Sequence, residues 1–141
     1  MAPAPLDSEE FDRWRIEARS ALRAASSQVG LGLHNWACFL AEQASQLAVK
    51  GLLAGIGQPT WGHDLVRLGD EARSALEDGW PGRLDPALRR LSRHYITSRY
   101  PDAVPSGTPG GHYGPEDSEQ ALADAGAVLG AVDRAWADMS S

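Results

Sequence analysis

Residues 33–53 constrain the fold of this chain more than any other stretch, because their apolar side chains recur at every third or fourth position. The repeating residues are Leu33, Trp36, Ala37, Leu40, Ala44, Leu47 and Ala48. Phe39, Val49 and Leu53 add apolar side chains to the opposite side of the same helix. A helix that is apolar around most of its circumference is usually enclosed by other elements. We therefore expect a long central helix inside a bundle.

One strip of polar residues interrupts the apolar surface of this central helix, and it consists of Glu42, Gln43, Gln46 and Lys50. Buried polar side chains need hydrogen-bonding partners or a ligand. In one interpretation, Glu42, Gln46 and Lys50 are neighbours four residues apart that satisfy one another at the surface. In the other, the strip faces a ligand.

The first and third helices have recognisable capping residues at their starts. Asp7 and Glu10 have the spacing of a capping box, and the apolar pattern after them predicts a helix over about residues 8–27. Glycine-rich segments then separate the central helix from its neighbours on both sides. Thr60 is the expected cap of a third helix that ends near residues 79–81.

The fourth and last helices complete the bundle. Asp85 is the expected cap of the fourth helix, because Pro86 suits the first helical position. Pro101 disfavours helical geometry at the residue before it, so this helix should end around residues 98–99. A flexible loop is expected over residues 102–116, before a last helix that begins near residue 117. The seam of this helix, a candidate dimer face, consists of Leu122, Ala125, Leu129, Val132, Trp136 and Met139.

The predicted fold class is therefore an all-α bundle of five helices. The length of 141 residues is typical of one domain, and we expect a single domain over residues 1–141 with its core at about residues 8–138. The net charge of −6 and the pI near 5.1 argue against a protein that coats nucleic acid by charge alone.

Several other classes of protein are disfavoured by the sequence. The single Cys38 excludes an internal disulfide, and no stretch approaches the roughly 18 apolar residues that span a membrane. The start of the chain lacks the features of a secretory leader, so a cytoplasmic location without membrane attachment is expected. The common phosphate-loop, zinc and serine-nucleophile motifs are absent, and we expect no cofactor and no metal. The scattered histidines are His34, His63, His94 and His112.

Arginines are concentrated around the predicted fourth helix. Helical geometry turns Arg89, Arg90, Arg93 and His94 away from the buried side, which predicts a solvated cationic face. Tyr95 belongs to the buried side of this helix, and Arg99 continues that side one turn later, where it must find a carboxylate of the bundle or an anion. His63, at the start of the third helix, either packs on Trp61 and the backbone or points at the same cleft as Lys50.

Four features in this order resemble the HEPN family (higher eukaryotes and prokaryotes nucleotide-binding), in particular its small stand-alone members with an RYPD motif. They are Trp14 at the start of the first helix, FLAEQASQLAVKGLL in the second, HDLVRL in the third and YITSRYPD closing the fourth. The resemblance covers residues 11–136. It implies an antiparallel up-and-down bundle, frequent homodimerisation, a nucleotidyltransferase-type partner protein, and a polar site between the central helix and the end of the fourth.

The resemblance also implies a set of ligand-binding residues. Lys50, His63, Arg99 and Tyr100 would line a pocket for the phosphate of a nucleotide or RNA, or for another anion, and Gln43 would recognise a polar edge. Lysine supplies a mobile charge, arginine a planar fork and tyrosine a stacking face. The leading hypothesis is therefore a binding module that is not an enzyme.

Two alternatives remain open at this point. Many HEPN proteins are RNases with an R-x4-6-H motif, and Arg99 matches the arginine, but Val104, Pro105 and Ser106 occupy the positions of the histidine. His112 is then the candidate partner of Arg99 in a toxin-like, metal-independent endoribonuclease of a toxin–antitoxin pair. Arg89 and His94 have the spacing, but a helix turns their side chains apart. The other alternative is a dimerising interaction domain without a ligand.

Overall fold

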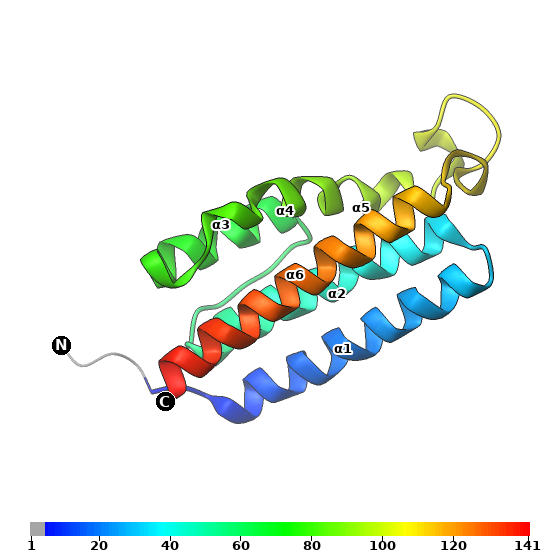
Figure 1. Cartoon of the computed structure of the whole chain (residues 1–141). Coiled ribbons are helices and arrows are strands. Elements are labelled where there is room, and N and C mark those ends of the chain that lie inside the picture. The colour runs from blue at the N-terminus through cyan, green and yellow to red at the C-terminus, as the bar shows by residue number, and fades with distance from the viewer. Residues whose placement is uncertain (1–4) are drawn as a thin grey trace.

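Helices α1 (Ser8–Gly30) and α2 (His34–Gly55) form an antiparallel hairpin in the computed structural model, which describes residues 5–141 (Figure 1). The Asp7 carboxylate accepts a hydrogen bond from the backbone N–H of Glu10 at 3.0 Å, so the cap expected for α1 is confirmed. Gly32, with φ of 73°, allows the chain to reverse between the two helices. Residues 1–4 of the predicted domain lie outside the described residues.

A second group of short helices packs against the central helix. It contains α3 (Leu65–Leu76), the 3₁₀ helices η1 (Glu77–Gly79) and η2 (Gly82–Leu84), α4 (Asp85–Ser92) and α5 (His94–Thr97). In Figure 1 these helices are green; α3 and α4 lie side by side, and α5 continues the line of α4. The predicted fourth helix is thus divided at Arg93, between α4 and α5.

The last helix, α6 (Pro115–Ser140), lies along α2 on another side, drawn from orange to red in Figure 1. Before it, the chain passes through η3 (Pro101–Ala103) and η4 (Pro109–His112), so the expected loop contains two 3₁₀ turns. No strand occurs within residues 5–141. The all-α, five-helix bundle is confirmed, with its fourth helix in two pieces.

Two predicted caps and one predicted helix start are wrong. Asp64, not Thr60, caps α3, because its carboxylate accepts the backbone N–H of Val66 at 3.1 Å. Asp85 lies inside the first turn of α4, where its carboxylate accepts a hydrogen bond from Arg73 instead of the helix backbone. The last helix begins at Pro115, two residues earlier than expected, because proline suits the first helical position.

The central position of α2 is confirmed, but its buried side differs from the predicted stripe. Ala37, Ala44 and Ala48 are buried, whereas Leu33 and Trp36 are 42% and 43% exposed. Neighbouring helices cover the other side instead, where the residues below 1% exposure include Cys38, Ala41, Glu42, Ser45, Val49, Leu52 and Leu53. Glu42 of the polar strip therefore lies in the interior.

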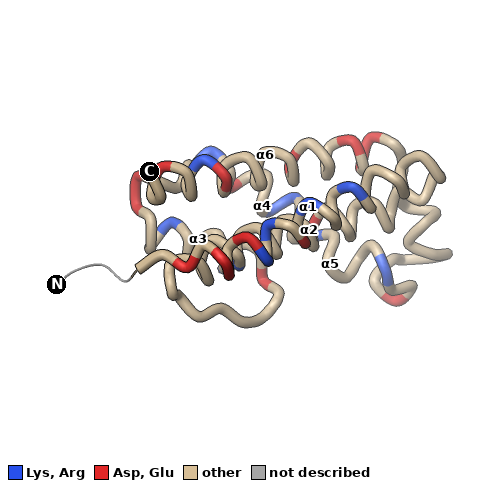
Figure 2. Tube along the Cα trace, turned by 90° about the horizontal axis from the view of Figure 1, so that it is seen from below, with Lys and Arg blue, Asp and Glu red and all other residues tan. Residues whose placement is uncertain are grey.

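The seam of α6 packs within the chain. Ala125, Leu129 and Val132 belong to the core, and the Trp136 ring stacks on Phe11 with centroids 4.1 Å apart. This seam is therefore not the open apolar face that was expected for dimerisation. Within residues 5–141, no helix is long and apolar enough to cross a membrane. Figure 2 shows Lys and Arg positions scattered among Asp and Glu positions over several helices.

Candidate functional site

The polar strip of α2 is built around the carboxyl group of Glu42, whose residue is 0% exposed. Gln43 Nε2 donates to Glu42 Oε1 at 2.8 Å, and Gln46 Nε2 donates to Glu42 Oε2 at 2.5 Å. Gln46 also donates to the backbone carbonyl of His63 at 3.1 Å. The expected contact between Glu42 and Gln46 is therefore present, but it lies in the interior and not at the surface, and Gln43 and the backbone before α3 supply the other partners.

Burial raises the pKa of the Glu42 carboxyl to about 7. The hydrogen bonds from Gln46 and Gln43 and the positive charges of Arg99 and Lys50 all oppose this rise. Both cations therefore lie near enough to Glu42 to stabilise its ionised form. A carboxyl group with this pKa changes its charge near neutral pH.

Arg99 is held by aromatic rings and a carbonyl oxygen. Its Nε and Nη2 donate to the backbone carbonyl of Tyr95 at 2.8 and 2.5 Å. Its guanidinium carbon lies 4.2 Å from the ring centre of Phe39, 4.8 Å from that of Tyr95 and 4.9 Å from that of Tyr100. No ion pair joins Arg99 to a carboxylate within residues 5–141. Of the two partners considered for Arg99, the bundle carboxylate is thus not engaged.

The backbone that carries Arg99 is fixed at the end of α5. The helix ends at Thr97, close to the predicted position, and Pro101 begins η3. Ser98 is fully buried, and its backbone carbonyl accepts a hydrogen bond from Asn35 Nδ2 at 2.9 Å. This link attaches the segment to the first turn of α2 and defines where the Arg99 side chain begins.

His63 joins the site from the segment before α3. Its ring stacks on Tyr95, with centroids 5.2 Å apart and planes 16° from parallel. The ring partner of His63 is therefore Tyr95, whereas Trp61, considered as its partner, is 71% exposed. Gly62, with φ of 83°, makes the tight turn, and Asp64 caps the helix directly after it.

Lys50 lies one helical turn beyond Gln46 and is half-buried. Burial lowers the pKa of its ammonium group, the nearby Arg67 lowers it further, and Glu42 raises it. Arg67 is itself paired with Glu71 at 2.6 Å. Lys50 therefore carries a positive charge without an ion pair among the described residues.

The structure thus places five predicted site residues around one group of side chains. They are Gln43, Lys50, His63, Arg99 and Tyr100. Phe39, Glu42 and Tyr95 connect them and were not predicted as site residues. Glu42 was recognisable as part of the polar strip, whereas the apolar pattern assigned Phe39 and Tyr95 to packing alone.

The histidine considered for a nuclease lies elsewhere in the chain. His112 is exposed in η4, and its Nε2 donates to the backbone carbonyl of Ser106 at 2.6 Å. Within residues 5–141, every hydrogen bond and ring contact of the Arg99 side chain is to Tyr95, Phe39 or Tyr100. In the part of the chain that the structure describes, no three His, Cys, Asp or Glu side chains come together to hold a metal ion.

The cationic face of α4 and α5 is largely solvated as expected, since Arg89, Arg90 and Arg93 are exposed and only His94 is half-buried. Arg90 donates twice to the Asp124 carboxylate, at 2.9 and 2.8 Å, and Asp124 is 5% exposed. His94 Nδ1 and Tyr113 Oη lie 2.9 Å apart, and burial lowers the pKa of this histidine. Arg89 remains exposed, so Arg89 and His94 do not form a joint site.

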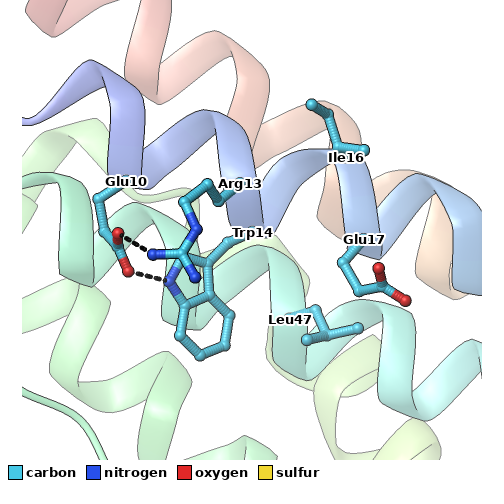
Figure 3. Close-up of a pocket in the computed structure, with 6 residues that line it drawn as sticks. All are labelled: Glu10, Arg13, Trp14, Ile16, Glu17 and Leu47. Atoms are coloured by element: carbon cyan, nitrogen blue, oxygen red, sulfur yellow. Dashed lines mark hydrogen bonds and ion pairs between the residues drawn. The ribbon is translucent and has the colours of Figure 1, made fainter.

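A separate groove of about 520 Å³ lies on the outer surface of α1 and α2 (Figure 3). Its lining residues are Glu10, Arg13, Trp14, Ile16, Glu17 and Leu47. The Glu10 carboxylate accepts from Arg13 Nη1 and from Trp14 Nε1, both at 2.9 Å. These polar groups satisfy one another, and the groove contains none of the predicted site residues.

Known structures and families agree with this architecture. TT1696 from Thermus thermophilus is 38% identical, with a TM-score of 0.84 over 89% of this chain and 97% of that one. ST0689, an archaeal HEPN homologue, is 29% identical, with a TM-score of 0.73 over 87% and 94%. The HEPN domain protein tm0613 from Thermotoga maritima is 26% identical, with a TM-score of 0.68 over 86% and 94%. No curated protein matches the chain.

The sequence profile of the HEPN domain matches residues 11–135, which include α1 through most of α6. The matched region contains every predicted site residue and the three rings around Arg99. This chain belongs to the HEPN domain family.

Proposed function

We propose that this protein is a HEPN binding module that holds the phosphate of a nucleotide or nucleic acid between Lys50 and Arg99. The observation that carries the proposal is the state of Arg99, whose charge is held in place without an ion pair to a carboxylate among residues 5–141. A guanidinium group has five N–H donors, and Tyr95 engages two of its nitrogens. The remaining N–H groups suit a phosphate oxygen.

The neighbouring residues have complementary roles in this proposal. Lys50 adds a second, more mobile positive charge. Tyr100 is 47% exposed and offers a ring face to a base or sugar. Gln43 and His63 supply polar groups that recognise the polar edge of the bound ligand.

The assembly and location expected from the family remain part of the proposal. We propose a homodimer, a nucleotidyltransferase-type partner and a cytoplasmic location. A chain with one buried cysteine has no use for an oxidising compartment. Size-exclusion chromatography with light scattering measures the oligomeric state directly.

The test is a calorimetric titration of the protein with pyrophosphate and with adenosine monophosphate. Arg99→Ala and Lys50→Ala should each weaken binding about ten-fold or more, because each removes one charged contact to the phosphate. Arg89→Ala is the matched control, since Arg89 is exposed on α4. Equal affinity in wild type and Arg99→Ala contradicts the proposal.

Two further outcomes identify the alternatives. Cleavage of mixed-sequence RNA in EDTA by wild type, but not by Arg99→Ala, would establish a nuclease. A melting temperature that no nucleotide raises would favour an interaction domain without a ligand.

A further inference from the structure

The carboxyl group of Glu42 lies within electrostatic range of both proposed phosphate-binding cations but is hydrogen-bonded to neither. We infer that Glu42 regulates anion binding at this site through its own proton. With the carboxyl protonated, Lys50 and Arg99 present two positive charges to an anion. With the carboxyl ionised, a negative charge buried beside them weakens the binding. This inference rests on the proposed function.

The geometry keeps the regulator separate from the ligand. Glu42 is 0% exposed, and its two oxygens accept hydrogen bonds from Gln43 and Gln46. A neutral carboxyl still accepts hydrogen bonds, so the two amides can hold it in either charge state. Glu42 therefore changes the charge of the site without occupying the place of the anion.

The charged groups that face Glu42 come from three elements. Lys50 belongs to α2, Arg99 follows α5, and the segment before α3 contributes the carbonyl of His63. Arg67 of α3 acts on Lys50 and is paired with Glu71. The charges that act on the Glu42 carboxyl are therefore those of Lys50 and Arg99, while the rings of His63 and Tyr95 stack on each other in the same site.

The other packed helices direct their charges elsewhere. Arg90 of α4 is bound to Asp124 of α6. On the side of α1, Arg15 is bound to Asp133 of α6 at 2.9 Å. Asp124 and Asp133 are thus engaged by other arginines. Glu42 is the acidic group that shifts the pKa of Lys50.

Thermodynamic linkage then fixes the direction of the effect. Burial raises the pKa of Glu42 to about 7, so its proton is exchanged near neutral pH. An anion and a proton both favour the same state of the site, and each increases the affinity for the other by the same factor. Anion binding near neutral pH should therefore take up a proton.

Calorimetry with sodium sulfate tests the inference, because sulfate keeps its charge between about pH 6 and pH 8. Wild type should bind sulfate about five-fold more tightly at pH 6 than at pH 8, as expected if the pKa of Glu42 rises by about one unit on binding. Glu42→Gln should bind equally at both values. Titrations in two buffers of different ionisation enthalpy should show proton uptake for wild type and none for Glu42→Gln.

His63→Gln separates the contribution of the carboxyl from that of the neighbouring imidazole. His63→Gln should weaken sulfate binding at both pH values. The ratio of the affinity at pH 6 to the affinity at pH 8 should stay the same as in wild type. The inference is overturned if sulfate affinity still depends on pH in Glu42→Gln, or if it no longer depends on pH in His63→Gln. The proposed function stands in either case. Absence of sulfate, pyrophosphate and nucleotide binding at either pH overturns both.

Carbon NMR of the Glu42 carboxyl in wild type provides a measurement that needs no variant. The apparent pKa should rise by about one unit when sulfate is added. An unchanged titration curve at saturating sulfate overturns the inference.

Discussion

The guanidinium carbon of Arg99 lies 4.2 Å from the ring centre of Phe39, although Phe39 belongs to α2 and Arg99 follows α5. Tyr95 and Tyr100 place two further rings within 5 Å of the same atom, at 4.8 and 4.9 Å. A ring face attracts a cation but does not neutralise its charge. The rings therefore orient Arg99 before any anion arrives.

Replacing Phe39 by Leu should weaken pyrophosphate binding about two- to five-fold. A cation–π contact at a partly exposed site is worth about 0.5–1 kcal/mol, and the freed guanidinium must be ordered again on binding. Phe39→Tyr should retain most of the affinity because it keeps the ring. Isothermal calorimetry at one pH measures the pyrophosphate affinity of wild type, Phe39→Leu and Phe39→Tyr.

Trp36→Leu is the matched control for this prediction. The Trp36 ring contacts the edge of Phe39, with centroids 6.4 Å apart, and Trp36 is not among the rings around Arg99. The role assigned to Phe39 is wrong if Trp36→Leu weakens binding as much as Phe39→Leu does.

Glu42 should make the protein less stable as the pH rises. Its pKa is about 7 in the folded state, against 4.5 for an ordinary glutamate, so the folded state binds more protons between these values. The free energy of unfolding should therefore fall by about 3 kcal/mol from pH 4.5 to pH 7 through this group, and then remain level. Urea denaturation at several pH values measures it.

Glu42→Gln should remove this contribution, so the comparison is the difference between the two pH profiles. The lowered pKa of His94 acts in the opposite direction, because its folded form loses stability as the pH falls. His94 is present in both proteins and cancels in the difference. Parallel profiles for wild type and Glu42→Gln contradict the prediction.

The apolar periodicity of α2 was sufficient to predict its central position but not the burial of Glu42. Glu42 is buried because α3 and α5 cover that side of α2, and such coverage depends on contacts between segments far apart in sequence. The short-range pattern placed Glu42, Gln46 and Lys50 on one strip and contained no information about what lies above it. The pattern therefore left open whether the strip lies at the surface or faces a ligand.

The position of Arg99 was predictable, and its surroundings were not. Its spacing after Tyr95 placed it on the buried side of the fourth helix, where it is half-buried. Whether a ring packs against another ring or faces a cation depends on tertiary geometry, so the sequence assigned Phe39 and Tyr95 to the core alone. The sequence resemblance, rather than periodicity, singled out Tyr100.

Local capping chemistry was predicted correctly at α1 and wrongly at α3. Asp7 and Glu10 have the spacing of a capping box, and Asp7 caps α1. Thr60 and Asp64 are both good caps before α3, and the turn at Gly62 and the stacking of His63 select the later one. The choice depends on packing that the segment itself does not contain.

Asp64→Ala should therefore destabilise the protein by about 1 kcal/mol, because α3 loses the acceptor for its first N–H groups. Thr60→Ala should change stability by less than about 0.5 kcal/mol. Thermal unfolding followed by circular dichroism distinguishes the two. An equal loss in both variants would mean that the capping role is shared.

Gly55→Ala should destabilise the bundle by about 1–3 kcal/mol, because its Cβ would lie 2.5 Å from Trp136 Cζ3 and 3.1 Å from Phe11 Cβ. Trp136 must then move away from the stacked Phe11. Gly126→Ala is the matched control on α6, where an added Cβ meets nothing within 4 Å. That change should stabilise by about 0.5–1 kcal/mol, since alanine favours a helix. Urea denaturation measures the free energy of unfolding of both variants. A change in the same direction for both would contradict this packing of α2 against α1 and α6.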